Sequence, residues 1–229
     1  MDPELLPLLL AWFFAFVFST TLHEAAHAWA ALRLGDETAY QGGQVSLNPL
    51  PHMQREPIGM VVVPLISFFL MQGRWMIGWA SAPYDPTWAR RHPKKSALMA
   101  LAGPVSNLLL FVLAGIAMRV GLQSGYFLPG GGSLSALILG SGATASAGLA
   151  TVLSVFFTLN VVLFAFNLIP VPPLDGSGVI QLFMPDDLAR RYQELFTNPM
   201  WSIVGLVAAW RLFDFVFGPI FRLALLIVV

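Results

Sequence analysis

The sequence predicts an all-α polytopic membrane protein with about four to five membrane helices and a re-entrant or short-strand segment. Of its 229 residues, 57% are hydrophobic and 10% are charged, and the mean hydropathy is +0.73. Soluble globular chains are about 45–50% apolar and about 25% charged. Twelve basic and twelve acidic residues cannot cover the surface of a soluble fold of this length, so the composition excludes a soluble enzyme.

The charge and the cysteine content narrow the chemistry further. The formal net charge is zero, so nothing predicts a nucleic-acid partner. Cysteine is absent, which excludes disulfides, Cys-ligated zinc, iron–sulfur clusters and thiol catalysis. Any metal in this chain must therefore be held by His, Asp or Glu.

Four stretches reach the length of about 20 mostly apolar residues that a spanning helix needs. They are Leu5–Leu34, Ser96–Val120, Gly148–Ile169 and Trp201–Val229. We expect one membrane-embedded domain over residues 1–229, in which 34–95 form a loop and re-entrant region, 176–198 an interfacial segment and 199–229 a C-terminal membrane helix. The glycine-rich segments 130–132 and 140–148 are expected to be flexible connections.

The region between the first two spans holds a shorter apolar stretch, Pro57–Gln72, which contains Pro57, Gly59 and Pro64. Upstream of it, Gln44–Leu47 alternates in polarity and is expected to form a short strand. Downstream, the turn-rich segment 73–93 leads into the next span.

Basic residues collect in cytoplasmic loops and therefore indicate topology. The first span has acids before it and Arg33 after it, and the cluster from Arg90 to Lys95 is the most basic in the chain. Both lie on the inside only if Pro57–Gln72, with its return through Trp75–Pro83, is a re-entrant hairpin that makes no net crossing. The alternative, an ordinary span, would leave five Lys and Arg residues between Arg74 and Lys95 on the wrong side.

The segment His23–His27, with the sequence His-Glu-Ala-Ala-His, is the sharpest chemical signal. Residues four apart share one face of a helix about 6 Å apart along the axis, so both imidazoles can bind one zinc ion. Glu24 is placed to act as the general base on an activated water. Ionisable groups inside a membrane helix cost about 2.5–3.5 kcal/mol each and are usually functional. The alternative is a helix end at the membrane interface that carries these residues incidentally.

Zinc needs a third protein ligand, and several residues qualify by chemistry. The candidates are Asp36, Glu37, His52, Glu56, Asp85, His92 and Asp175. Most of them lie in polar loops, whereas Asp175 follows a long apolar helix in a segment stiffened by three prolines. Zn²⁺ with two neutral histidines and the carboxylates of Asp175 and Glu24 sums to zero charge, and the topology places both segments at the same side of the membrane.

Two motifs resemble the site-2 protease family of intramembrane zinc metalloproteases. They are His23–His27 on a membrane helix and the Asn-x-x-Pro-x-x-x-x-Asp-Gly run from Asn167 to Gly176, and the segment 102–107, with Gly103-Pro104, resembles the family's Gly-Pro helix between them. The resemblance covers roughly residues 8–185. It implies one zinc ion held by His23, His27 and Asp175, with Glu24 as the catalytic carboxylate.

The resemblance also implies that Asn167 lies near the reacting carbonyl, where its amide could stabilise an oxyanion. The alternative is an Asn that caps or packs a helix. We assign substrate contact to Asn107 and to Trp79, Ala80 and Ser81, which could pair as an edge strand with an unwound substrate; the alternative for the last three is an interfacial loop with aromatic anchors. The PDZ and CBS modules of many family members have no counterpart in this chain.

We therefore expect a zinc-dependent intramembrane endopeptidase that cleaves transmembrane segments of other membrane proteins. It should lie as a multi-pass protein in the lipid bilayer of the plasma membrane, with its active site toward the cytoplasm. A membrane metal transporter that uses the same His and Asp site is the alternative, and a silent binder of membrane helices is a third class. Only the protease requires Glu24.

Overall fold

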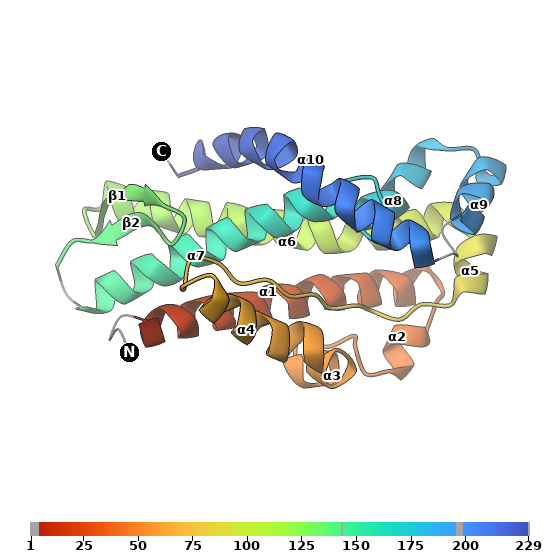
Figure 1. Cartoon of the computed structure of the whole chain (residues 1–229), viewed down its shortest axis with the longest axis horizontal. Helices are drawn as coiled ribbons and strands as arrows, with labels where there is room; N and C mark the ends of the chain where they lie inside the picture. Colours follow the sequence, from red (N-terminus) through yellow and green to blue (C-terminus); the bar gives the residue numbers. More distant parts are fainter. Residues whose placement is uncertain (1–4, 143, 196–198, 229) are drawn as a thin grey trace.

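The computed structural model describes residues 5–142, 144–195 and 199–228 (Figure 1). Three long helices run side by side: α1 (Leu5–Leu34), α6 (Pro93–Gln123) and α7 (Thr144–Asn167). All three are long and apolar enough to cross a membrane, and two bent helix pairs raise the number of candidate spans to as many as five. The all-α polytopic class predicted from the sequence is confirmed.

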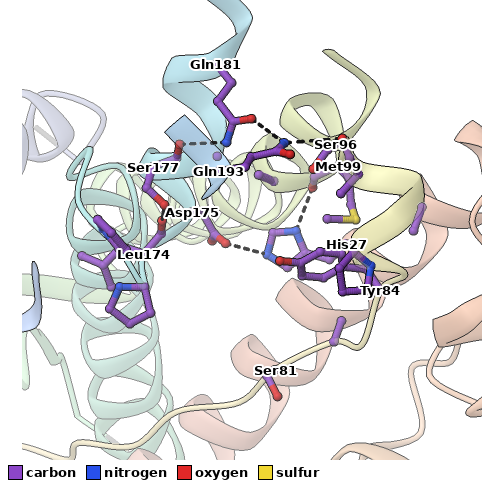
Figure 2. Close-up of a pocket in the computed structure, with 18 of the residues that line it drawn as sticks. His27, Ser81, Tyr84, Ser96, Met99, Leu174, Asp175, Ser177, Gln181 and Gln193 are labelled. Atoms are coloured by element: carbon purple, nitrogen blue, oxygen red, sulfur yellow. Dashed lines mark hydrogen bonds and ion pairs between the residues drawn. The ribbon is translucent and has the colours of Figure 1, made fainter. Parts of the chain in front are cut away.

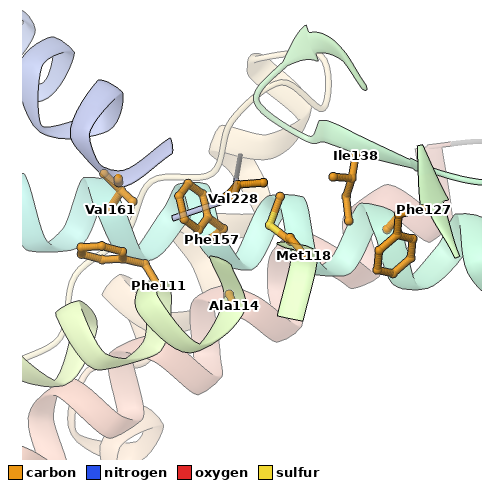
Figure 3. Packing of buried hydrophobic residues seen from close by; sticks show 10 residues of the cluster. Phe111, Ala114, Met118, Phe127, Ile138, Phe157, Val161 and Val228 are labelled. Atoms are coloured by element: carbon orange, nitrogen blue, oxygen red, sulfur yellow. The ribbon is translucent and has the colours of Figure 1, made fainter. Parts of the chain in front are cut away.

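The fourth predicted span is the bent helix α10 (Pro199–Leu225), which lies on α7 and turns by 51° between 200–213 and 215–225. Together with α6, α7 and the strand hairpin it encloses an apolar core (Figure 3). Phe111 of α6, Phe157 of α7 and Val228 after α10 meet there. Aromatic edge-to-face contacts join Phe157 to Phe111 and to Phe221.

Residues 36–92 form the region that lies against one side of α1. It contains the short helices α2 (Thr38–Gln41), α3 (Pro49–Arg55), α4 (Val63–Leu70) and α5 (Pro86–Arg91), with a π-helical turn at Ile58–Val62. Residues 75–85, which we call the strap, have no regular secondary structure and run back along α1 toward α5 (Figure 1). Phe68 and Met76 pack against Trp12 of α1.

The segment between Glu56 and Ser81 starts at the end of α3 and returns to its own starting point. The chain bends by 111° between Pro49–Arg55 and Ile58–Leu70. At the close of the loop, the Ser81 hydroxyl donates to Glu56 Oε1 (2.5 Å) and Arg55 Nε donates to the Ser81 carbonyl (3.2 Å). The chain therefore returns to its starting point within this segment, and the expected re-entry without a net crossing of the membrane stays a prediction.

The strand expected at Gln44–Leu47 is wrong: residues 44–47 form a bent connection between α2 and α3. The backbone N–H of Gln44 bonds to the Ala39 carbonyl (2.9 Å), which closes the end of α2. Asn48 then caps α3 by accepting from Leu50 N (3.1 Å). Local polarity alternation predicted a strand, but a strand needs a partner, and capping of the two flanking helices takes the backbone groups instead.

A strand hairpin occupies the glycine-rich segment that was expected to be flexible. Strands β1 (Phe127–Ser133) and β2 (Ala136–Gly140) pair antiparallel, with Phe127 opposite Gly140. Polar groups of α7 satisfy the hairpin backbone: Ser154 Oγ accepts from Leu137 N (3.1 Å), and Thr158 Oγ1 donates to the Leu134 carbonyl (2.8 Å). These hydrogen bonds are tertiary, which is why local composition missed the hairpin.

The chain after α7 turns back through prolines into α8 (Asp175–Val179), a 3₁₀ turn at Ile180–Phe183 and the polar helix α9 (Asp186–Leu195). Lys94, at the start of α6, donates its ammonium hydrogens to the carbonyls of Gln181 (3.0 Å), Leu182 (2.9 Å) and Met184. These bonds fix the 3₁₀ turn after α8 to the start of α6. The polar helix expected in this segment is present as α9, and its place at the membrane interface stays a prediction; residues 196–198, with which the expected interfacial segment ends, lie outside the described part of the chain.

Candidate metal centre

His23 and His27 lie one turn apart on α1 and point at the first residue of α8. His23 Nε2 is 3.0 Å from Asp175 Oδ2, and His27 Nε2 is 3.3 Å from Asp175 Oδ1. The two Nε2 atoms are 3.0 Å apart. Figure 2 shows the His27 ring and the Asp175 carboxylate directed at each other. Two of the three residues are buried, and together they form a group with metal-binding geometry.

The hydrogen bonds of the two imidazole rings leave lone pairs that favour a bound cation. His23 Nδ1 lies 2.6 Å from Asn107 Oδ1, and His27 Nδ1 lies 2.8 Å from the Met99 carbonyl. A neutral imidazole has one N–H. In each of the two rings, the oxygen beside Nδ1 is an acceptor, so the hydrogen lies on Nδ1. Both Nε2 atoms then present lone pairs to the Asp175 carboxylate, whose Oδ2 has no hydrogen-bond partner among the described residues.

The geometry of these converging lone pairs fits zinc. Tetrahedral zinc with ligands at about 2.0–2.1 Å keeps neighbouring ligand atoms about 3.3 Å apart. The observed separations of 3.0 Å and 3.3 Å are close to that spacing. His23, His27 and Asp175 therefore fit the ion as three ligands, and a fourth position is left for water or substrate.

Gly103 of α6 makes room for the centre. A Cβ at this position would lie 2.3 Å from His27 Nε2 and 2.5 Å from His23 Nε2. Any side chain would thus fill the space between the imidazoles and Asp175. The sequence marked Gly103 only as part of a Gly-Pro segment, and its proximity to the ligands is a structural finding.

Gly176 lets α8 start against the end of α7, which sets the position of Asp175. A Cβ on Gly176 would lie 2.4 Å from the carbonyl oxygens of Leu168 and Ile169. Three prolines precede it and force the chain out of the α7 helix. The turn between α7 and α8 therefore needs glycine at this position, which explains why Gly176 directly follows Asp175.

A cavity of about 610 Å³ adjoins the metal centre. Glu24, which is 6% exposed, and His27 line it from α1. The strap, which runs beside α1, lines it with Ala80–Tyr84, and residues of α8 and α9, among them Ser177 and Gln193, line it on the other side (Figure 2). A carboxylate beside the metal ligands and open to a cavity can act on a water held there.

The strap is hydrogen-bonded along one of its two edges. Ile77 N bonds to Ser67 Oγ (2.9 Å), Trp79 N bonds to the Gly59 carbonyl (3.1 Å), and the Ser81 carbonyl accepts from Arg55. These odd-numbered groups all face α3, the π-helical turn and α4. Among the described residues, the backbone N–H groups of Gly78, Ala80 and Ala82 have no hydrogen-bond partner. Ala80 and Ala82 line the cavity, so we call this the open edge of the strap.

The remaining predicted site residues differ in whether they reach the cavity. Ala80 and Ser81 line the cavity, whereas Trp79, half-exposed, is not among its lining residues. Asn107 is fully buried and bonded to His23, so it is not the substrate contact that the sequence suggested. Asn167 is the last residue of α7, partly buried and outside the lining of the cavity.

His52, considered above as a third ligand, lies apart from the metal centre. It is 1% exposed, and its Nε2 lies 3.0 Å from the Ser46 carbonyl in the loop before α3. Its role is to hold that loop. Of the candidate carboxylates, Asp175 is the one that the structure brings to the histidine pair.

Sequence reasoning missed the residues that support the ligands. Asn107 Nδ2 donates to Asn160 Oδ1 (2.9 Å) on α7, and both side chains are fully buried. The available signal was an Asn in the middle of each of two apolar spans, where an unpaired amide is costly. Which atoms they contact depends on the packing of three helices and could not be read from one sequence.

Comparisons with known proteins agree with this arrangement. A family model described as "Peptidase family M50" matches residues 11–212. A Bacillus subtilis protein named "Putative zinc metalloprotease YwhC" is 30% identical over 227 residues, which cover 89% of this chain and 91% of that protein. No solved structure matches the chain significantly.

Two longer relatives carry the name "Putative zinc metalloprotease Rip2". The one from Mycolicibacterium smegmatis is 27% identical over 177 residues, which cover 76% of this chain and 57% of that protein. The one from Mycobacterium tuberculosis H37Rv is 27% identical over 205 residues, which cover 90% of this chain and 69% of that protein. The similarity therefore extends over most of this chain.

Proposed function

The chain belongs to peptidase family M50, the site-2 proteases, and from this premise we propose that it is an endopeptidase that cuts other membrane proteins inside the bilayer. It is an integral membrane zinc metalloprotease of the site-2 type. What we add by proposal is the set of residues that carry the reaction, the kind of substrate and the side of the membrane from which the site is reached.

The observation that carries the proposal is the convergence of His23, His27 and Asp175, with Glu24 beside them at the cavity. Zinc bound by these three ligands supplies a Lewis acid that acidifies a water molecule and polarises the scissile carbonyl. The charges of the ion, Asp175 and Glu24 cancel, which lowers the cost of placing them at membrane depth.

Glu24 moves the proton in this proposal. Its carboxylate takes a proton from the attacking water as the water oxygen bonds to the carbonyl carbon, and then gives that proton to the amide nitrogen as the C–N bond breaks. Such acid–base work typically contributes about 10²–10⁴-fold to the rate. Asn167 has no part in this scheme, because it is not among the residues that line the cavity.

The strap supports an extended substrate. Its open edge offers the N–H groups of Ala80 and Ala82, and the neighbouring residues line the cavity. A transmembrane segment that unwinds locally can pair with this edge as an added strand, with Ala80 and Ser81 in contact and Trp79 at its margin. A peptide bond in an intact helix is screened by its own hydrogen bonds, so helix-breaking residues in the substrate should promote cleavage.

The site is proposed to open toward the cytoplasm of a cell whose plasma membrane holds the protein. The basic residues Arg90, Arg91, Lys94 and Lys95 lie in α5 and at the start of α6, beside α9, and Arg90 and Gln193 line the cavity. Because basic loops stay in the cytoplasm, the cavity mouth shares that side.

The test is cleavage of a model transmembrane substrate by the purified protein in proteoliposomes. We expect Glu24→Gln to abolish cleavage while it keeps one zinc per chain, since Glu24 is not a ligand. Cleavage by this variant at the native rate would contradict the catalytic assignment. Zinc flux into proteoliposomes with the substrate left intact would favour a transporter instead.

A further inference from the structure

A chain of buried hydrogen bonds links the metal ligand His23 to all three long helices. His23 Nδ1 on α1 donates to Asn107 Oδ1 on α6 (2.6 Å), and Asn107 Nδ2 donates to Asn160 Oδ1 on α7 (2.9 Å). Asn160 Nδ2 in turn donates to Ser19 Oγ on α1 (2.9 Å) and to the Phe156 carbonyl (2.8 Å). The two amides and Ser19 have no solvent exposure.

At Asn160, the donor and acceptor roles in this series of hydrogen bonds are fixed. The Phe156 carbonyl can only accept a hydrogen bond, so the amino group of Asn160 must face it. Asn160 Oδ1 then faces Asn107, and Asn107 must offer its amino group to that oxygen. Asn107 Oδ1 is left for His23, which requires the His23 proton on Nδ1 and frees Nε2 as a lone pair toward Asp175.

We propose that Asn160, assisted by Ser19, is a positioning residue that sets the tautomer of His23 by fixing the direction of the Asn107 amide. Without Asn160, the Asn107 amide can rotate and present its amino group to His23 Nδ1. His23 would then carry its proton on Nε2 and could not bind a metal. This inference rests on the zinc centre of the proposed function, but it concerns metal binding and not cleavage.

His27 provides the internal comparison. Its Nδ1 donates to the Met99 carbonyl (2.8 Å), a backbone group that cannot rotate to offer a donor. His27 therefore needs no second residue to select its tautomer, whereas His23 depends on an amide that could face either way. The Asn107–Asn160 pair fixes the tautomer of His23, as the Met99 carbonyl fixes the tautomer of His27.

The first measurement needs no variant. In the metal-free wild-type protein, ¹⁵N NMR of the histidine rings should find a proton on Nδ1 of His23. A His23 ring without a proton on Nδ1 would overturn the proposal. This reading does not depend on whether the protein cleaves anything, so it stands or falls separately from the protease assignment.

The second experiment is a rescue. Removal of an outer hydrogen-bond partner of a metal ligand typically costs about 10–100-fold in metal affinity. Asn160 acts on His23 through that partner, Asn107, so we expect Asn160→Leu to weaken zinc binding by about 10-fold in a chelator competition assay. An Asn107→Asp/Asn160→Leu double variant should recover most of the affinity, because a carboxylate accepts from His23 whichever way it turns. An unrecovered affinity would contradict a role through amide direction.

Thr158→Val is the matched control for a merely structural effect. Thr158 is buried two residues from Asn160 on the same helix, but its hydroxyl bonds to the Leu134 carbonyl of the hairpin. We expect it to lower the thermal stability of α7 packing and to leave the zinc dissociation constant within about 3-fold. Equal losses of zinc affinity in Thr158→Val and Asn160→Leu would overturn the proposal.

Discussion

The two sides of the cavity are built on opposite principles. On the metal side, both imidazoles have their Nδ1 hydrogens committed, one to a side chain and one to a backbone carbonyl. On the strap side, Ile77 N, Trp79 N and the Ser81 carbonyl are hydrogen-bonded along one edge, and the N–H groups of the other edge have no partner among the described residues. The difference teaches that the metal side is fixed before substrate arrives, whereas the strap side keeps unpaired groups that a substrate can complete.

We expect the largest effect from a substitution of Gly103, which lies beside the metal centre. We expect Gly103→Ala to lower zinc affinity by 100-fold or more, on the order of 3 kcal/mol, because its Cβ would lie within 2.5 Å of both imidazole Nε2 atoms. Chelator competition measures the change. Gly148→Ala is the control, since a Cβ there would meet nothing within 4 Å. Equal zinc affinity in the two variants would contradict the claim that Gly103 leaves space for the metal ion.

A smaller effect tests the open edge of the strap. Ala80→Pro removes one N–H from that edge, so we expect KM for a model transmembrane substrate to rise about 10-fold, near the value of one hydrogen bond, with zinc content unchanged. Steady-state kinetics in proteoliposomes measure it. Ala80→Ser keeps the N–H and should retain the wild-type KM. If both variants behave alike, the substrate does not pair with this edge.

The smallest effect concerns the frame that holds the strap. Asp36 accepts from Thr38 N (3.0 Å) and Thr38 Oγ1 (2.6 Å), and its Oδ2 accepts from Asp85 N (2.9 Å) at the end of the strap. Burial alone would raise the pKa of Asp36, but these hydrogen bonds lower the pKa below its usual range. Its stabilisation is therefore present above the unfolded pKa of about 3.9 and is lost as the pH falls through the lower folded pKa.

We expect Asp36→Asn to destabilise the protein by about 1–2 kcal/mol at neutral pH and by progressively less as the pH falls below about 4. Thermal unfolding of both proteins across pH 3–7 measures this difference. The exposed Asp186 supplies the control through Asp186→Asn, which should leave stability unchanged. A destabilisation by Asp36→Asn that is independent of pH would show that the charge of Asp36 plays no part.

Sequence predicted the elements whose signal is local. Apolar length gave the long helices, and His23–His27 gave the ligand spacing because one helical turn fixes it. Asp175 stood out because a carboxylate after an apolar helix needs a counter-charge. The hairpin 127–140, the clearance at Gly103 and the Asn107–Asn160 pair depend on contacts between distant segments, and no periodicity encodes them.

The misplaced residues follow the same rule. Asn107 was assigned to substrate contact because it belongs to the Gly-Pro segment. Its side-chain direction is set by how α6 packs on α1, and there it contacts His23. Asn167 was placed near the carbonyl by the resemblance of its motif to the site-2 protease family. The turn through three prolines separates it from Asp175, and Asn167 does not reach the cavity lining.

The central claim is that two imidazoles and one distant carboxylate hold a single zinc ion, and X-ray absorption at the zinc edge of the purified protein tests it most directly. We expect one zinc per chain, with two imidazole nitrogens at about 2.0–2.1 Å and oxygen in the remaining positions. A spectrum with fewer than two imidazoles in a protein that contains one zinc per chain would contradict the account.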